Sequence, residues 1–356
     1  MLTHLDLTNF RSYRNFKLEI EQPLVVIMGP NAVGKTNLLE SIYVASTTHS
    51  FRAKDSEIIH FGEDFYRVVA SFENIEQEIR FVTNGDSHRK NALLSGVKKP
   101  LSSAVGINPV TIFEPNDMNL LTGPPSVRRK YLDSVLAQID KKYLSSLSAY
   151  RKILKQRNSL LHQSRQKGIR SLDDQLFIWD LQLVEPATYI IKSRQEFIGM
   201  IAKLMRHYYH EISGKKDDLK ISYESTAMSN KSKLLHQIRD SQQKDLHAGF
   251  TTIGPHRDDF SVIFKGNNIT QIASRGELRT IVLALKLAEL DFIESKLAKR
   301  PILLLDDVFS ELDGKRREYL VSSISGQQTI ITTTDMDKNL KPTYQLIDLS
   351  GGGYVT

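Results

Sequence analysis

The stretch from Leu24 to about Ser46 constrains the fold more than any other part of the sequence. An uninterrupted apolar run, Leu24–Met28, is followed by G-P-N-A-V-G-K-T at residues 29–36 and then by a segment of helical character. A short apolar run of this kind is typical of a buried strand. A G-x-x-x-x-G-K-[ST] pattern between a strand and a helix indicates a phosphate-binding P-loop. The alternative is a glycine-rich turn that only caps the helix.

The residue types of this loop suit a nucleotide. Glycine permits backbone conformations that let successive N–H groups converge on a phosphate, and the helix N-terminus adds a partial positive charge. Lys35 is expected to reach the β- and γ-phosphates, and the Thr36 hydroxyl to bind Mg²⁺. The sequence therefore predicts ATP and Mg²⁺ as cofactors. The predicted nucleotide-binding residues here are Gly29, Pro30, Asn31, Ala32, Val33, Gly34, Lys35 and Thr36.

A second apolar run, Ile302–Leu305, ends in two carboxylates, Asp306 and Asp307. In a chain with a P-loop this pattern predicts the strand that completes the magnesium site. Asp306 would hold Mg²⁺ through water, and Asp307 would orient and polarise the attacking water. Lys35 and Asp307 are thus the predicted catalytic residues. The alternative for the two aspartates is a strand-end turn that caps a helix.

Three further motifs occupy definite places in the chain, one before Asp306–Asp307 and two after them. S-R-G-E at residues 274–277 precedes a predicted helix over 276–299, S-E-L-D lies at 310–313, and T-T-T-D at 332–335 follows a predicted strand. This order resembles the ABC-type ATPases. The resemblance implies that Ser274 and Gly276 cover the γ-phosphate held by a second copy, so that ATP bridges a two-fold homodimer. The alternative for Ser274–Glu277 is an ordinary helix N-cap with a capping box.

The positive charge of the chain is concentrated in one segment. The whole chain carries a net charge of +7, whereas residues 121–170 hold twelve Lys and Arg against Asp133 and Asp140, a net of +10. We predict a sequence-independent DNA-binding surface there. The alternative is the solvated face of a helix. The candidate DNA-binding residues are Lys141, Lys142, Arg151, Lys152 and Lys155.

The same segment has helical periodicity, and a second helix is predicted from Asp173 to about His210, with an interruption at Pro186. The apolar seam of the first helix consists of Tyr143, Leu147, Tyr150, Leu154 and Leu161, and Arg157 interrupts it. Strands are predicted on both sides of this helical region, among them 2–8, 66–72, 107–113, 250–263 and 329–333. The predicted fold is α/β, an ATPase head (1–122 and 246–356) with an inserted α-helical lobe (123–245).

Composition excludes several classes of protein. The chain has no cysteine, which excludes a disulfide scaffold, thiolate chemistry and a Cys-ligated metal. The longest apolar runs fall far short of the ~20 residues of a membrane helix, and the N-terminus has no signal-peptide pattern. We therefore expect a cytoplasmic protein with no membrane association.

Further motifs bring the sequence close to one family. With the motifs above, L-T-N-F-R-S-Y at residues 7–13, S-F-R at 50–52, F-E-P-N-D at 113–117, Arg128–Arg129 and G-P-H-R-D-D at 254–259 resemble the RecF family. The resemblance implies an ABC-type head related to structural-maintenance-of-chromosomes proteins, with weak, DNA-stimulated ATP hydrolysis. It implies ATP-dependent dimerisation on duplex or gapped DNA, cooperation with RecR and RecO in loading RecA, and a role in DNA repair, replication restart and the SOS response.

Departures from the family pattern add expectations. Ala32 stands where related heads often have glycine, and we expect it to keep a negative φ. Glu277 is expected to point back at its helix cap rather than at the γ-phosphate. Asp307 is one methylene shorter than the glutamate usual in ABC proteins, which predicts slow turnover. Arg11 contacts either the nucleotide or only solvent.

Some alternatives stay open at this level. Residues 254–259 form either a turn with a local ion pair between Arg257 and an aspartate, or a site near DNA or at the dimer interface. The whole chain could instead be the nucleotide-binding subunit of a transporter, a small-molecule P-loop kinase, or a nucleotide-gated scaffold without meaningful hydrolysis.

Overall fold

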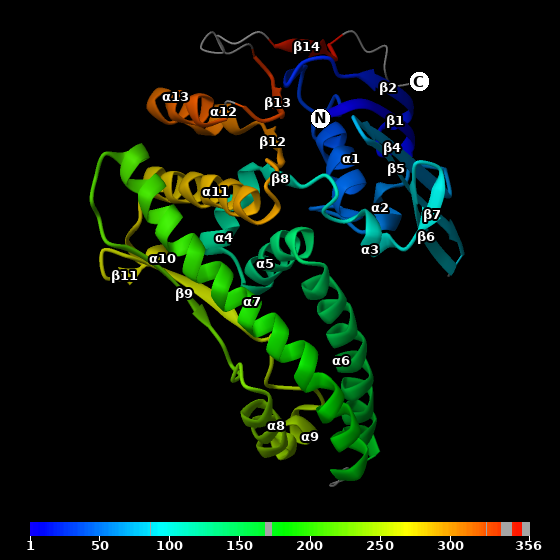
Figure 1. Ribbon diagram of the computed structural model, residues 1–356, viewed down its shortest axis with the longest axis vertical. Helices are drawn as coiled ribbons and strands as arrows, with labels where there is room; N and C mark the ends of the chain where they lie inside the picture. The colour runs from blue at the N-terminus through cyan, green and yellow to red at the C-terminus, as the bar shows by residue number, and fades with distance from the viewer. Residues whose placement is uncertain (86, 168–172, 325, 336–343, 351–356) are drawn as a thin grey trace. The chain divides into compact units, whose positions relative to one another are not determined.

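The computed structural model describes the 356-residue chain except for residues 86, 168–172, 325, 336–343 and 351–356 (Figure 1). The chain forms two compact units. The first contains residues 1–118, 211–214 and 275–356, and the second contains residues 119–210 and 215–274. The predicted head, 1–122 and 246–356, and lobe, 123–245, have the same interrupted arrangement with different limits, and that division stays a prediction.

A five-stranded parallel sheet of the first unit positions the predicted motifs. Because its strands run parallel, their carboxyl ends meet at one edge of the sheet. The P-loop follows one of these strands at that edge, and Asp306 is the last residue of another. In spatial order the strands are β14 (Gln345–Asp348), β3 (Leu24–Met28), β13 (Thr329–Thr333), β12 (Ile302–Asp306) and β8 (Val110–Phe113).

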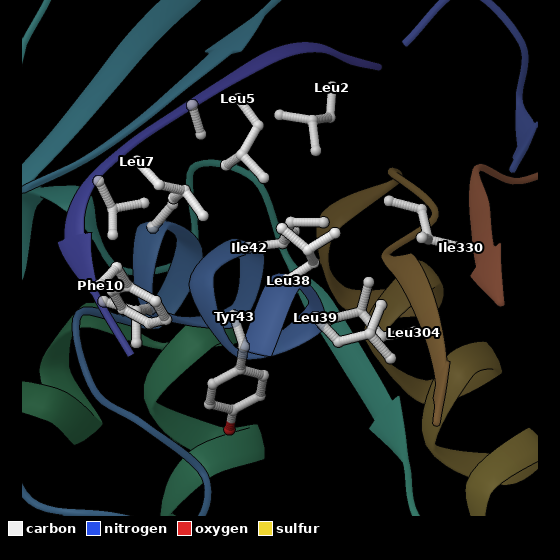
Figure 2. Close-up of a cluster of buried hydrophobic side chains, with 14 of the residues drawn as sticks. Leu2, Leu5, Leu7, Phe10, Leu38, Leu39, Ile42, Tyr43, Leu304 and Ile330 are labelled. Atoms are coloured by element: carbon white, nitrogen blue, oxygen red, sulfur yellow. The ribbon is translucent and has the colours of Figure 1, made fainter. Parts of the chain in front are cut away.

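A six-stranded antiparallel sheet completes the unit, in the order β2-β1-β4-β5-β6-β7. Helix α1 (Lys35–Thr47) contacts strands of both sheets, so the first unit has one core centred on this helix. Figure 2 shows Leu38 and Ile42 of α1 among Leu5, Leu304 and Ile330 from the surrounding strands. The six strands are β1 (Leu2–Phe10), β2 (Tyr13–Glu19), β4 (Phe65–Phe72), β5 (Ile75–Asn84), β6 (Ser87–Leu94) and β7 (Val97–Lys99).

The other helices of the first unit flank these sheets. The longest of them, α11, was predicted over 276–299 and is confirmed. They are α2 (Asp55–Ile58), α3 (Leu101–Ala104), the 3₁₀ helix η1 (Pro115–Met118), α11 (Arg275–Leu297), α12 (Val308–Glu311) and α13 (Gly314–Ser323).

The second unit contains the predicted long helices and a small sheet, β11-β10-β9. The last turn of α7, from Glu211, belongs to the first unit. The elements are α4 (Asn119–Thr122), α5 (Pro125–Ile139), α6 (Lys141–Lys167), α7 (Asp173–Ser213), β9 (Leu219–Glu224), α8 (Lys231–Asp240), α9 (Gln242–Ala248), β10 (Asp259–Phe264), β11 (Asn267–Asn268) and α10 (Ile269–Ile272).

The apolar seam predicted for α6 is confirmed, since Tyr143, Leu147, Tyr150 and Leu161 are buried and Leu154 is half-buried. Arg157, which interrupts the seam, is completely buried. Its Nε donates to Asp180 of α7 at 2.7 Å, and its Nη1 donates to Asp245 of α9 at 2.7 Å. The arginine is therefore the ionic centre of this helical packing.

Two predictions for this region are wrong. Pro186 does not interrupt the second helix, because α7 runs through it from Asp173 to Ser213. Packing of buried neighbours such as Val184 and Ala187 offsets the hydrogen bond that proline removes. The strand predicted over 250–263 is confined to β10, because residues 250–258 form a turn-rich segment instead.

Candidate nucleotide-binding site

The loop between β3 and α1 adopts at Gly34 a backbone conformation that is open to glycine and disfavoured for other residues. Gly34 is the N-cap of α1 and has φ +112°. A Cβ atom there would also lie 2.6 Å from the Tyr13 hydroxyl. Glycine is thus required at this position by both conformation and space.

Ala32 departs from expectation. Its φ is +66°, so the prediction of a negative φ is wrong. The loop turns sharply enough that a residue with a Cβ adopts the left-handed region, at a cost of roughly 1 kcal/mol. The conformation of the loop at Ala32 therefore lowers the free energy of unfolding.

Replacing Ala32 with glycine is therefore expected to raise the free energy of unfolding, by about 0.5–1 kcal/mol, because glycine adopts φ +66° without strain. Urea titration measures the change. Ala53→Gly is the matched control, because Ala53 is not among the described positive-φ residues, and it should lower stability. Equal loss of stability in both variants would contradict the strain assigned to Ala32.

Lys35 lies inside the loop. Its Nζ donates to the Gly29 carbonyl at 2.7 Å and to the Pro30 carbonyl at 2.9 Å. Burial lowers the pKa of this ammonium, and the negative charges of Asp307 and Asp306 oppose that shift. An ammonium has three donors, so one remains for an anion entering the loop.

A hydroxyl–carboxylate chain joins the loop to the neighbouring strands. The Thr36 hydroxyl donates to both oxygens of Asp306, at 2.8 and 2.9 Å. Asp306 also accepts from the Thr332 hydroxyl of β13 at 2.8 Å. The same Thr332 oxygen accepts from the Asp307 backbone N–H at 3.0 Å. The carboxyl ends of β12 and β13 are therefore tied together around Asp306.

Asp307 occupies the left-handed region, with φ +51°, as the N-cap of α12. The chain turns abruptly after β12, and Asp307 joins the lining of a hollow of about 220 Å³. This hollow brings together most of the predicted P-loop residues and both predicted aspartates. Its lining comprises Asn31, Ala32, Gly34, Lys35, Thr36, Asn37, Arg52, Asp306 and Asp307.

Arg52 was not among the predicted site residues, although the S-F-R motif contains it. Its guanidinium donates to Asn37 at 2.6 Å and to Glu40 at 2.7 Å. Glu40 is completely buried in α1 and also receives two hydrogen bonds from Arg11, each 2.9 Å long. Neither alternative for Arg11 describes this, since Arg11 pairs with Glu40. The sequence alone does not show that the two arginines share the Glu40 carboxylate, so it could not predict this cluster.

Asp313 of the S-x-L-D motif and Gly276 of the S-x-G-E motif, both in the first unit, are linked through Arg316. Asp313 caps α13 by accepting from the Arg316 backbone N–H at 3.0 Å, and its carboxylate pairs with the same arginine. Arg316 also donates to the Gly276 carbonyl of α11 at 3.0 Å. Ser274 and Gly276 are not among the described residues that line the hollow. Their contact with a nucleotide of a second copy stays a prediction, as does the direction of Glu277.

The G-P-H-R-D-D segment forms a buried polar network in the second unit. Asp258 is completely buried and accepts from the Tyr223 hydroxyl at 2.6 Å and from the Thr226 backbone N–H at 2.7 Å. Asp259 pairs with Arg128 at 2.6 Å. The two aspartates therefore bind groups outside the segment, and a local pair with Arg257 is not among the described ion pairs. The segment organises the second unit.

His256 of this network gives the protein a pH-dependent stability. Its Nε2–H donates to the Thr251 carbonyl at 3.0 Å, so Nδ1 accepts from the Tyr150 hydroxyl. Burial lowers the pKa of His256 to about 4. As the pH falls below 6.5, the unfolded chain takes up the proton first, so stability falls with pH in the window from 6.5 to 4.

Between pH 7 and pH 5, His256 is expected to cost about 2 kcal/mol of unfolding free energy. Urea titrations of wild type and His256→Gln at both values test this. The variant should be less stable at pH 7, because it loses hydrogen bonds, and the gap should close at pH 5. A gap that stays constant would show that His256 does not carry the effect.

The candidate DNA-binding residues all lie on α6 and are all exposed, and some of them have intramolecular partners. Arg151 donates to Asp133 at 2.8 Å, and the Lys142 ammonium lies 4.5 Å from the centroid of the Tyr189 ring. Among the residues that the structure describes, Lys152 and Lys155 form no ion pair, which makes them the better probes of this surface.

The hollow, its P-loop lysine, Asp306 at the end of β12 and Asp307 directly after it define a P-loop nucleotide-binding head. A family model described as the RecF/RecN/SMC N terminal domain matches residues 1–348. The chain belongs to this family, and within it to the RecF proteins. Its fold is accordingly that of an ABC-type ATPase head, as predicted.

The RecF relatives match the chain over nearly its whole length. A DNA replication and repair protein RecF of Agathobacter rectalis is 37% identical over 353 residues, which cover 97% of this chain and 95% of the relative. A RecF of Bacillus cereus is 37% identical over 347 residues, covering 94% and 92%. A solved RecF structure with ATPrS, described as a recombination mediator of the RecFOR pathway, has a TM-score of 0.87 at 34% identity, covering 98% and 96%.

Among the helices described, none is long and apolar enough to cross a membrane.

Proposed function

We propose that the chain is an ATP-dependent DNA-binding clamp that acts in recombinational repair and replication restart. The observation that carries this proposal is the Thr36–Asp306–Thr332 chain beside Lys35 in a hollow of P-loop residues. RecF relatives described as DNA replication and repair proteins, and a RecF structure with ATP at TM-score 0.85, support it.

The hollow suits a magnesium nucleotide. Mg²⁺ usually takes one or two protein oxygens, and phosphate and water supply the rest. Thr36 and Asp306 would hold it, since a hydroxyl and a carboxylate already lie 2.8 Å apart there. When bound, Mg²⁺ neutralises developing phosphate charge.

The chain's own residues perform the other steps. The P-loop N–H groups cradle the phosphates, and Lys35 donates its free hydrogen to them. Asp307 orients the attacking water and accepts its proton. The short side chain of Asp307 makes hydrolysis weak, so ATP acts more as a clamp than as a fuel, and DNA stimulates turnover.

Dimerisation follows from the position of the signature. Ser274 and Gly276 of one copy cover the γ-phosphate held by the P-loop of another, with the N-terminus of α11 directed at the phosphate. Arg316 holds the first turn of that helix through the Gly276 carbonyl. The clamp then encloses DNA as a two-fold dimer, and RecR and RecO cooperate with it in loading RecA and in the SOS response.

The decisive experiment measures DNA affinity for single-stranded, duplex and gapped substrates, with and without ATP, while light scattering follows dimerisation. We expect ATP to produce dimers and to tighten binding to duplex or gapped DNA in a strongly salt-dependent way. A chain that stays monomeric with ATP, or binds DNA equally without it, would contradict the clamp.

A charge-reversal pair tests the DNA surface itself. Lys152→Glu with Lys155→Glu should weaken DNA binding at least about tenfold and reduce the salt slope by about two. Lys98→Glu with Lys99→Glu, on the exposed strand β7, is the matched control. Equal effects of the two pairs would place the DNA surface away from α6.

A further inference from the structure

A second and larger cavity, of about 560 Å³, lies at the other edge of the parallel sheet. The two cavities lie at opposite ends of strand β12, because its last residue, Asp306, lines the nucleotide hollow and its first residue, Ile302, lines this cavity. The cavity is lined where β3, β8, β12 and β13 start. Its volume falls in the range of ligand-binding pockets in proteins.

The floor of the cavity is rigid. Pro23, Pro109 and Pro301 each precede one of the strands and all three line the cavity. Proline fixes its own φ and has no N–H. The Pro23 carbonyl accepts from the Thr329 N–H, and the Pro109 carbonyl from the Ile302 N–H, both at 2.8 Å. Side chains must therefore supply what a ligand would recognise.

Two buried polar atoms in the lining have no hydrogen-bond partner among the residues that the structure describes. They are the Thr329 hydroxyl and the Gln327 Nε2. Thr329 is 1% exposed. By contrast, the neighbouring Gln328 both donates to and accepts from the backbone of Leu2. An unpaired buried polar group costs about 1–3 kcal/mol, which a ligand with a carbonyl or carboxylate would relieve.

The shape of the cavity suits an extended chain. The four strands are neighbours in the order β3-β13-β12-β8, so at about 4.8 Å per strand their starts span about 14 Å. Four or five extended residues, at about 3.3 Å each, cover that distance. Aliphatic side chains such as Val321 and Ile324 of α13 form part of the wall.

The charged side chains in the lining are Lys299 and Arg300, and no carboxylate lies among the lining residues described. Both are exposed at the rim, where Arg300 pairs with Glu294 at 2.9 Å and Lys299 donates to Asn108 at 2.8 Å. A ligand carboxylate would therefore add to these partners or exchange with them. An extended peptide alternates its side chains between two faces. A segment that directs aliphatic groups into the cavity would therefore present every second side chain toward this basic rim.

We propose that this cavity binds an extended segment of a partner protein in which aliphatic residues alternate with carboxylates. The aliphatic side chains fill the apolar space, backbone carbonyls accept from Thr329 and Gln327, and the carboxylates pair with Lys299 and Arg300. The cavity shares no lining residue with the nucleotide hollow. An experiment can therefore contradict the peptide-binding proposal without contradicting the proposed ATP-dependent clamp, and the reverse.

Fluorescence polarisation with the full chain tests the proposal. The probe is a fluorescein-labelled pentapeptide of alternating leucine and aspartate, compared with peptides in which lysine replaces aspartate or serine replaces leucine. The wild-type chain should bind the first at least about tenfold more tightly than the other two. Octanoate is included, because a free aliphatic acid that competes as strongly as the peptide would overturn the assignment to a protein segment.

Variants locate the binding. Val321→Trp, which fills the cavity, and Lys299→Glu should each weaken peptide binding at least about tenfold, whereas Lys296→Glu, outside the lining, should not. Thr329→Val removes the unpaired hydroxyl at constant shape and should weaken peptide binding by less than Val321→Trp or Lys299→Glu does. ATP affinity should remain unchanged in all four, which verifies their folding. Unchanged peptide binding by Val321→Trp, or equal binding of the three peptides, would overturn the proposal.

Discussion

Replacing Lys35 with methionine is expected to lower ATP affinity by about 100-fold or more. The ammonium is held within the loop by the Gly29 and Pro30 carbonyls, so it meets the phosphates already in place. A charge-assisted hydrogen bond in a partly buried site is worth about 3 kcal/mol, which corresponds to that factor. Isothermal titration with ATP and Mg²⁺ measures the loss directly, and hydrolysis should vanish with it.

Stability separates this effect from misfolding. Because burial lowers the pKa of Lys35, the charged amine is not favoured by the folded state, and the variant should melt close to wild type. ATP should raise the melting temperature of the wild type and not that of the variant. Lys17→Met, on the exposed side of β2, is the control and should retain the ATP response. Wild-type affinity in Lys35→Met would exclude the hollow as the nucleotide site.

Replacing Arg157 with leucine is expected to destabilise the second unit by about 3–5 kcal/mol. The substitution leaves Asp180 and Asp245 buried without their shared cation. Burial already raises the pKa of Asp180 even with Arg157 present, so Asp180 should bind a proton more readily in the variant. Chemical denaturation followed by circular dichroism measures the loss, which should shrink as the pH is lowered toward 5.

Two further variants test the ionic explanation. Gln156→Leu changes an exposed neighbour on α6 and should leave stability within about 0.5 kcal/mol of wild type. Adding Asp180→Asn and Asp245→Asn to Arg157→Leu should recover part of the loss, since replacing a whole buried ionic cluster is far less costly than breaking it. A triple variant less stable than Arg157→Leu would show that packing, not uncompensated charge, dominates.

Sequence reasoning predicted that most of the residues lining the hollow lie close together, because they follow local rules. The P-loop and the Asp306–Asp307 pair each sit at the end of an apolar run, and parallel strands bring such ends to one edge. The seam of α6 was equally readable, because burial of one helix face imposes a period that the sequence must follow.

The remainder depended on distant partners. Nothing local to Arg52 or Arg11 indicates that both bind Glu40, a residue on a different element. Ala32 was misjudged because propensity describes a residue in isolation, while closure of the loop imposed φ +66°. Pro186 was misjudged for a similar reason, since tertiary packing outweighed the local cost of proline.

The placement of Asp306 and Asp307 in the same hollow as Lys35 has a consequence for the ionic form of the nucleotide that we expect to bind there. Two carboxylates lie there with the Lys35 ammonium and with Arg52, which Glu40 already binds. A fully charged polyphosphate without a divalent cation would therefore meet repulsion from both aspartates. The same anion with a divalent cation already attached would be attracted by Lys35 through its phosphates and by Asp306 and Asp307 through the cation. We therefore expect the hollow to favour metal-loaded nucleotide, and chelation of the metal should weaken nucleotide binding without any change in nucleotide concentration.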